Sequence, residues 1–226
     1  MTKVPQTEQS SDSAAYRTQT NVGFNARVEP LWFTYHRLAC KLGILARWRE
    51  RRRIRRIVSR ANAQLKEQGV SPDSWDQASG ECVSNLRVAR MGLSAELHLF
   101  LRANTKEGDE ANWKHLFAQR ERDAIALPID FPEPFTLSSG PTTLQVTSSF
   151  RLRQELEQAN TVLKIEKALA LVKMSKIDFI DANEKDISVY ESRFSTLDGF
   201  WPKFAYVLFK KLADKSLETK FPILFA

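Results

Sequence analysis

The sequence has few residues that could form a crosslink or a metal site: 226 residues include two cysteines and three histidines. Cys40 and Cys82 stand far apart, and neither has a second cysteine at metal-ligand spacing, so we expect free thiols in a reducing compartment. His36, His98 and His115 fall on separate predicted helices without carboxylate or cysteine partners at ligand spacing. We therefore expect neither a disulfide nor a metal centre.

Glycine is also scarce, and its pattern excludes the common nucleotide cradles. The eight glycines form neither GxGxxG nor GxxxxGK, the loops that hold a phosphate against the amino end of a helix. No serine or cysteine has a neighbouring base in sequence that would activate it as a nucleophile. The sequence thus predicts no cofactor and no catalytic residue, and favours a non-enzymatic binding protein.

One acidic segment resembles a calcium loop only in composition. "DFIDANEKD", residues 178–186, can be aligned as an EF-hand loop that starts at Asp181. This alignment places Lys185 at a ligand position, Asp186 where the tight turn needs glycine, and Ser192 where the bidentate glutamate belongs. We therefore interpret the segment as a solvated helix end.

The sequence has no long apolar run that would suit a membrane or a secretory leader. Residues 1–28 are rich in Thr, Ser and Gln and are expected to form a disordered tail. Residues 31–48 are more apolar, but they contain Arg37, Lys41 and Arg47, each of which costs roughly 2.5 to 3.5 kcal/mol near a bilayer centre. We expect an intracellular, cytoplasmic protein without a transmembrane segment.

Positive charge is abundant and concentrated in one segment. Residues 1–70 carry a net charge of +9, whereas residues 71–130 carry −3 and residues 131–226 carry +1. The excess comes from "ARWRERRRIRRIVSR", residues 46–60, which holds eight arginines and one glutamate. The basic character is therefore a local feature rather than a property of the whole chain.

This basic segment has the periodicity of an amphipathic helix. At 100° per residue, five apolar side chains share one sector, which the arginines largely avoid. The apolar stripe is Ile54, Ile57, Val58, Ala61 and Leu65. The candidate binding residues are Arg47, Arg49, Arg51, Arg52, Arg53, Arg55, Arg56 and Arg60. We expect the stripe to pack on the protein and the arginines to face outward.

The rest of the chain predicts an all-α protein, an irregular bundle of about five helices in one domain. We expect helices at about 30–68, with a bend at Gly43, and at about 71–100, 110–124, 150–176 and 203–217. Gly69 should end the first helix, with Val70 against Leu65. The regions are a tail (1–28), a helical region (29–126), a Pro-rich connector or β-hairpin (127–148) and a second helical region (149–226).

The arginine helix is the main functional lead. A solvated or internally paired face is the plain alternative, but seven arginines within twelve positions repel one another, and Glu50 is the only nearby acid. Arginine suits bidentate recognition of phosphate and carboxylate, and the composition is similar to that of arginine-rich RNA-binding helices. We expect binding to a polyanion: RNA ahead of DNA, an acidic protein partner as runner-up, and an anionic membrane surface third.

Overall fold

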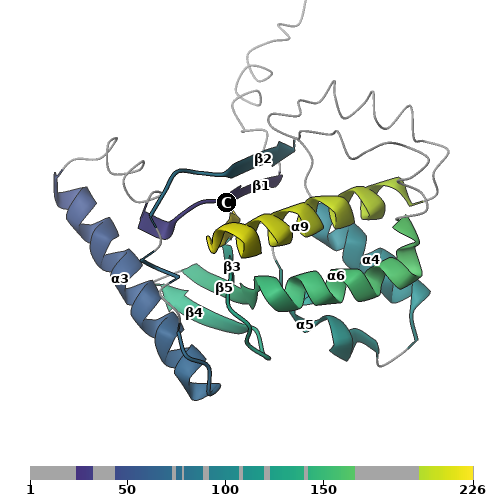
Figure 1. Cartoon of the computed structure of the whole chain (residues 1–226), viewed down its shortest axis with the longest axis horizontal. Helices are drawn as coiled ribbons and strands as arrows, with labels where there is room; N and C mark the ends of the chain where they lie inside the picture. Colours follow the sequence, from purple (N-terminus) through teal and green to yellow (C-terminus); the bar gives the residue numbers. More distant parts are fainter. Residues whose placement is uncertain are drawn as a thin grey trace, which may run out of the picture.

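The computed structural model shows an α/β protein, so the predicted all-α bundle is wrong (Figure 1). It describes residues 24–32, 44–72, 75–77, 79–88, 92–106, 109–119, 123–139, 142–165 and 199–225. The strands are β1 (Phe24–Val28), β2 (Ser84–Val88), β3 (Ala124–Leu127), β4 (Phe135–Ser139), β5 (Thr142–Ser148) and β6 (Ile223–Phe225). The helices are α3 (Ile44–Glu67), α4 (Leu93–Asn104), α5 (Lys114–Ala118), α6 (Ser149–Leu163) and α9 (Phe200–Thr219), with a 3₁₀-helix η2 (Asp109–Trp113) before α5.

The strands form one mixed, six-stranded sheet in the order β2-β1-β6-β3-β5-β4. Every neighbouring pair is antiparallel except β3 and β5, which run parallel. The short strand β6 lies inside the sheet, where Phe225 pairs with Ala26 of β1 and with Ala124 of β3. Segments from opposite ends of the chain therefore meet in the middle of the sheet.

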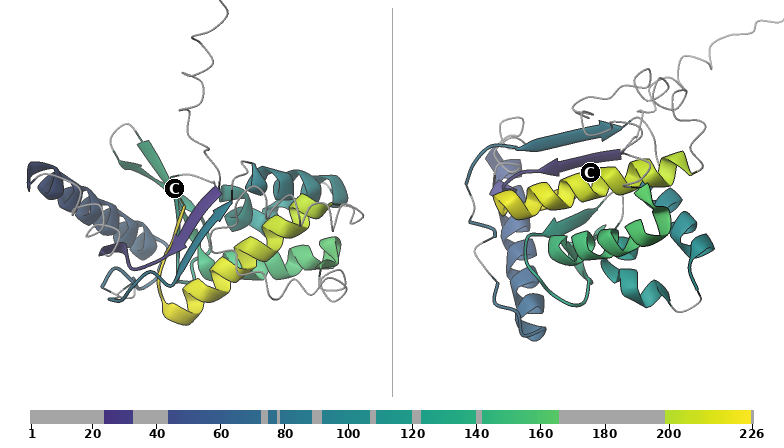
Figure 2. Two further views of the ribbon diagram at one scale, coloured as in Figure 1. Left: turned by 90° about the horizontal axis from the view of Figure 1, so that it is seen from above. Right: turned by 45° about the vertical axis from the view of Figure 1, so that its right-hand side comes forward.

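Both faces of the sheet are covered, as the alternation along β3 shows. Ala124 and Ala126 belong to the larger core, which α4, α6 and α9 complete. Ile125 and Leu127 point to the opposite side and join a second core beneath α3. Figures 1 and 2 show α3 on one side of the sheet and the other helices on the other side.

Helix α3 is anchored through the apolar stripe that the sequence predicts. Ile54, Val58, Ala61 and Leu65 are buried in the second core, and full burial of each larger aliphatic side chain contributes about 1.5 to 3 kcal/mol. No side chain from Leu45 to Arg53 is buried. The amino-terminal half of α3 therefore projects beyond the sheet, as the left view of Figure 2 shows.

The predicted end of this helix is confirmed. Gly69 adopts φ +74°, and the Val70 amide donates a hydrogen bond of 2.9 Å to the carbonyl of Leu65. This is the six-to-one bond of a Schellman cap, with glycine at the left-handed position. Val70 also packs against the second core, as the cap predicts.

Two segments predicted as helix or tail are strands instead. Ser84–Val88, inside the predicted helix 71–100, is β2, and Phe24–Val28, inside the predicted tail, is β1. The two strands pair with each other, for example Ala26 with Leu86, and β1 also pairs with β6. Such distant pairing overrides the local pattern, because strand preference depends on the neighbours that a strand finds.

Later segments agree better with the sequence. The predicted hairpin is confirmed, with Phe135 opposite Val146 in β4 and β5, although it belongs to the sheet rather than to a separate insert. The helix predicted at 110–124 is shorter, since α5 ends at Ala118 and β3 begins at Ala124. The helix predicted at 203–217 is confirmed within α9. The part of the predicted helix 150–176 that follows Ile165 lies outside the described residues, as does the acidic segment 178–186.

Candidate polyanion-binding site

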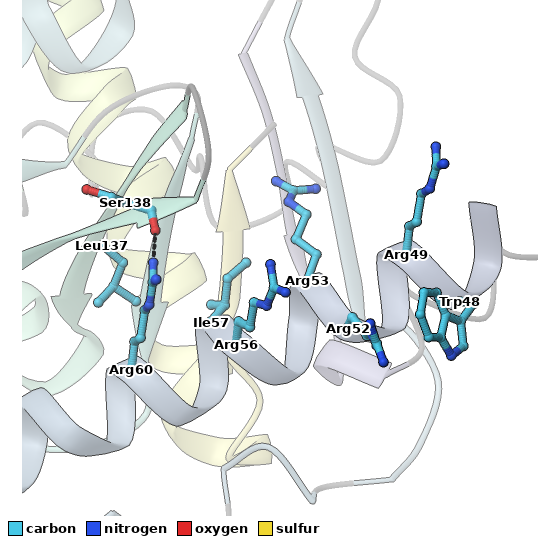
Figure 3. Close-up of a pocket in the computed structure, with 9 residues that line it drawn as sticks. All are labelled: Trp48, Arg49, Arg52, Arg53, Arg56, Ile57, Arg60, Leu137 and Ser138. Carbon is cyan, nitrogen blue, oxygen red and sulfur yellow. Dashed lines mark hydrogen bonds between the residues drawn. The ribbon is translucent and has the colours of Figure 1, made fainter. Parts of the chain in front are cut away.

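A groove of about 370 Å³ lies between α3 and the edge strand β4 (Figure 3). We call it the arginine groove. It is lined by Trp48, Arg49, Arg52, Arg53, Arg56, Ile57, Arg60, Leu137 and Ser138. None of these side chains is a carboxylate or a histidine. The lining is suited to holding an anion and contains no acid or base for catalysis.

The helical repeat explains why only some of the predicted arginines reach the groove. Arg49, Arg53, Arg56 and Arg60 recur at steps of four, three and four residues, which places them along one face of α3. Figure 3 shows these four side chains extending from the same side of the helix. Arg52 lies at the margin of that face and also lines the groove. Arg47, Arg51 and Arg55 are exposed but do not line the groove.

Strand β4 supplies the opposite wall of the arginine groove. Arg60 donates a hydrogen bond from Nη1 to the backbone carbonyl of Ser138, which joins α3 to the strand. The half-buried Ile57 and the buried Leu137 also line the groove and belong to the packing beneath it. Leu137 and Ser138 were not predicted as site residues, because 78 residues separate Ser138 from Arg60 and only the fold brings them together.

The charge of α3 is almost uncompensated along its own length. The helix holds nine basic and two acidic residues, a net charge of +7 that equals the net charge of the whole chain. Glu50 pairs with Arg53 at 3.1 Å in an exposed contact, which stabilises little in water. Within the described residues, no carboxylate pairs with Arg49 or Arg56. Bound phosphates would relieve the repulsion that this arrangement leaves.

Trp48 adds a flat aromatic surface at the amino-terminal end of the groove. Its side chain is 53% exposed, which is unusual for the largest apolar residue type. The guanidinium carbon of Arg52 lies 3.5 Å from the ring centroid and covers part of one ring face. This is a cation–π contact, and it also holds Arg52 beside the groove.

The other candidates from the sequence have structural roles where they are described. His98 Nε2 lies 2.7 Å from the carbonyl of Leu116. Cys82 is half-buried, and His36 and Cys40 lie outside the described residues. The part of the chain that the structure describes contains no group of three potential metal ligands. None of its helices combines the length and apolar character that a membrane-spanning segment requires.

Two titratable side chains, Glu155 and His115, are buried near each other, and the burial of Glu155 was not predicted. Glu155 of α6 accepts hydrogen bonds from the backbone amides of His115 and Leu116, at 3.0 and 2.6 Å, at the start of α5. Burial raises the pKa of Glu155 to about 7, against the opposing effect of these two amides. Burial likewise lowers the pKa of His115 to about 4. The sequence could have indicated the burial of Glu155, because this residue lies beside the buried Leu156 in the same helix.

His115 is held as a neutral ring between two backbone groups. Its Nδ1 accepts a hydrogen bond of 2.9 Å from the Ser148 amide, so its Nε2 carries the proton and donates to the carbonyl of Pro132 at 3.1 Å. This network joins α5 to the end of β5 and the loop before β4. It lies outside the lining of the arginine groove.

Comparisons with protein-family models, with curated protein sequences and with solved structures find no match. The arginine groove is therefore the feature of the described residues that indicates a function, through its geometry and its charge.

Proposed function

We propose that this protein binds nucleic acid, RNA in preference to DNA, through the arginine groove and the exposed amino-terminal half of α3. The observation that carries the proposal is the convergence of five arginines and a half-exposed tryptophan in one groove of about 370 Å³. The opposite face of the same helix is anchored in the core. Burial from Ile54 to Leu65 thus fixes the part of α3 that carries Arg56 and Arg60, and the helix continues from there to the arginines of its amino-terminal half.

The dimensions of the groove suit a phosphate chain. Arg49 and Arg60 are eleven residues apart, which is about 16 Å along an α-helix at 1.5 Å per residue. Successive phosphates of one strand advance by about 3.4 Å along a duplex axis, so this length accommodates at most about five phosphates, and an extended single strand places fewer there. The five guanidinium groups can therefore reach up to about five phosphates, each of which can accept two hydrogen bonds from one arginine.

Trp48 favours a ligand with unpaired bases, which RNA presents more often than DNA. Proteins that recognise RNA commonly stack unpaired bases on aromatic rings or on arginine planes. The groove offers both surfaces together, because Arg52 lies against the Trp48 ring. A site for duplex backbone alone would need the arginines but would gain nothing from an exposed tryptophan.

The test is the salt dependence of binding to an RNA hairpin and to a DNA duplex, measured by fluorescence anisotropy. If about five phosphates are neutralised, log K should fall with log salt with a slope of about −3.5 for single strands and −4.5 for duplex. The double variant Arg52→Gln/Arg56→Gln should weaken binding and reduce the slope by about 1.5 to 2.

A matched control removes the same charge elsewhere. Lys211→Gln/Lys215→Gln on α9 takes away two positive charges outside the groove and should leave the slope within about 0.5 of the original. Absence of salt-dependent binding to either nucleic acid at micromolar protein would overturn the proposal. Arginine-dependent binding to anionic vesicles, or to an acidic protein after nuclease treatment, would then identify one of the other two polyanions.

A further inference from the structure

The position of β4 restricts which form of nucleic acid the groove can accept. We propose, on the basis of the function above, that the arginine groove binds a single-stranded stretch, with one unstacked base against Trp48 and the phosphates along Arg49, Arg53, Arg56 and Arg60. The ligand class is thus single-stranded RNA or DNA rather than a duplex or a polyanion without bases.

Strand β4 limits the access of a duplex to α3. An α-helix with its side chains is about 10 to 12 Å wide, and the major groove of B-DNA is about 12 Å wide, so it admits a helix and little else. Arg56 and Arg60 face a groove whose other wall is β4, and Arg60 is bonded to Ser138 of that strand. A duplex could therefore reach the projecting amino-terminal half of α3, but it could not enclose Arg56 and Arg60 without displacing β4, so it would lose these two contacts. The major groove of an RNA duplex is narrower still.

The lining of the groove combines apolar side chains with arginines. Trp48 is 53% exposed and Ile57 is half-buried, so both present apolar surface in a groove that five arginines line. A sugar–phosphate chain without bases has nothing to bury against these side chains, whereas a base has two flat apolar faces. A volume of about 370 Å³ lies at the small end of the range for small-molecule sites, about 300 to 1,000 Å³, which suits one base with its sugar.

The exposed ring of Trp48 offers a surface on which one base can stack. Arg52 already covers part of one face of the ring, and the ring as a whole is 53% exposed. A base on the ring would complete a stack of guanidinium, indole and base. Stacking of a base on an aromatic side chain contributes about 1 to 3 kcal/mol by alanine substitution, with little dependence on sequence.

The experiment compares three polyanions: oligouridine of twelve nucleotides, the same strand paired with oligoadenosine, and inorganic polyphosphate. The duplex carries about twice the charge of the single strand, so charge alone would favour the duplex. Each of the three probes competes with fluorescent oligouridine for the full-length protein at about 0.2 M salt. We expect oligouridine to bind at least about tenfold more tightly than either other probe. Trp48→Leu should weaken oligouridine binding by about 5- to 150-fold, the range that corresponds to one stacked base, and change polyphosphate binding less than about twofold.

Two further variants separate stacking from charge and from folding. Trp48→Phe keeps an aromatic ring and should retain most of the oligouridine affinity. Because the indole is gone, the quenching of tryptophan fluorescence that a base stacked on Trp48 causes should disappear. Arg51→Gln/Arg55→Gln removes two charges from α3 outside the groove and should weaken all three probes equally. Circular dichroism melting checks that each variant is folded, as expected for exposed positions.

The outcomes distinguish this inference from the proposed function. Equal affinity for all three probes, with no selective effect of Trp48→Leu, would overturn the single-strand inference and leave polyanion binding intact. Equal weakening of all three probes by Trp48→Leu would show that Trp48 only positions Arg52, and would also overturn it. No binding of any probe would overturn the proposed function itself.

Discussion

At the scale of single residues, Glu155 and His115 show how burial sets the charge states of the core. Glu155 is 7% exposed and is held by two backbone amides, while His115 is 1% exposed and lies between two backbone groups. Burial penalises the charged form of each side chain, so the pKa of the acid rises and that of the base falls. Both residues are consequently favoured in their neutral forms in the folded protein near pH 5 to 6.

These two shifts should affect stability in opposite directions. Between pH 4.5 and about 7, the folded protein keeps a proton on Glu155 that the unfolded chain releases, so stability falls as pH rises. Between about pH 4 and 6.5, the unfolded chain protonates His115 while the folded protein does not, so stability rises with pH. Each effect amounts to about 3 kcal/mol across its range, and the two largely cancel in the native protein.

Single substitutions should expose each effect in turn. In Glu155→Gln only the histidine contributes, and the free energy of unfolding should rise from pH 4 to 6.5. In His115→Gln only Glu155 contributes, and the free energy of unfolding should fall from pH 4.5 to 7. Urea unfolding across this pH range measures both variants against the native protein. Identical pH profiles for all three proteins would contradict the assignment.

At the scale of elements, α3 depends on its buried stripe. Leu65 is fully buried at the carboxyl end of the helix, where Val70 packs beside it. Leu65→Ala should lower the free energy of unfolding by about 2 to 5 kcal/mol, through lost burial and the cavity left behind. The exposed neighbouring position offers a control, since Ala63→Ser should change stability by less than about 0.5 kcal/mol. Thermal or urea unfolding measures both, and similar losses would contradict the packing of α3.

The elements also show how far sequence reasoning could go. The stripe and the cap of α3 were predictable, because helical periodicity and the Gly69 signal are local. Strand β3 was not, because Ala124–Leu127 is buried on both faces and therefore has no polar alternation to separate it from a connector. Ser84–Val88 was missed for a related reason, since Leu86 fits a helical stripe equally well and only pairing with β1 decides between the two.

The candidate site was predictable only in part, because the local sequence does not determine which elements pack side by side. The arginines were identified from composition, but the division between groove and outer arginines depends on where β4 lies. Leu137 was expected in a hairpin, and nothing local indicates that this hairpin stands beside α3. The second wall of the groove is therefore a tertiary feature, which a single sequence does not reveal.

At the scale of the whole molecule, β6 joins the two parts of the sheet. It lies between β1, which pairs with β2, and β3, which continues to β5 and β4. Leu224 is opposite both Arg27 and Ile125, so a change there affects both sides. Leu224→Pro should prevent cooperative folding of the described domain, because proline removes a ladder hydrogen bond in the middle of the sheet.

Circular dichroism melting would measure this effect. Leu224→Val keeps the strand and should melt within a few degrees of the native protein, as expected for a loss of about 1 kcal/mol. A proline variant that melts like the native protein would contradict the central position of β6.

The position of β6 also has a consequence for synthesis. About 200 residues separate Ala26 from its partner Phe225, which corresponds to about 10 to 40 seconds at a translation rate of roughly 5 to 20 residues per second. The edge of β1 that β6 will cover is unpaired during this interval, and that of β3, which precedes β6 by about 100 residues, is unpaired for about half of it. Such edges can pair with other chains. Aggregation during expression should therefore depend on how quickly the ribosome reaches β6, and not only on the stability of the finished fold.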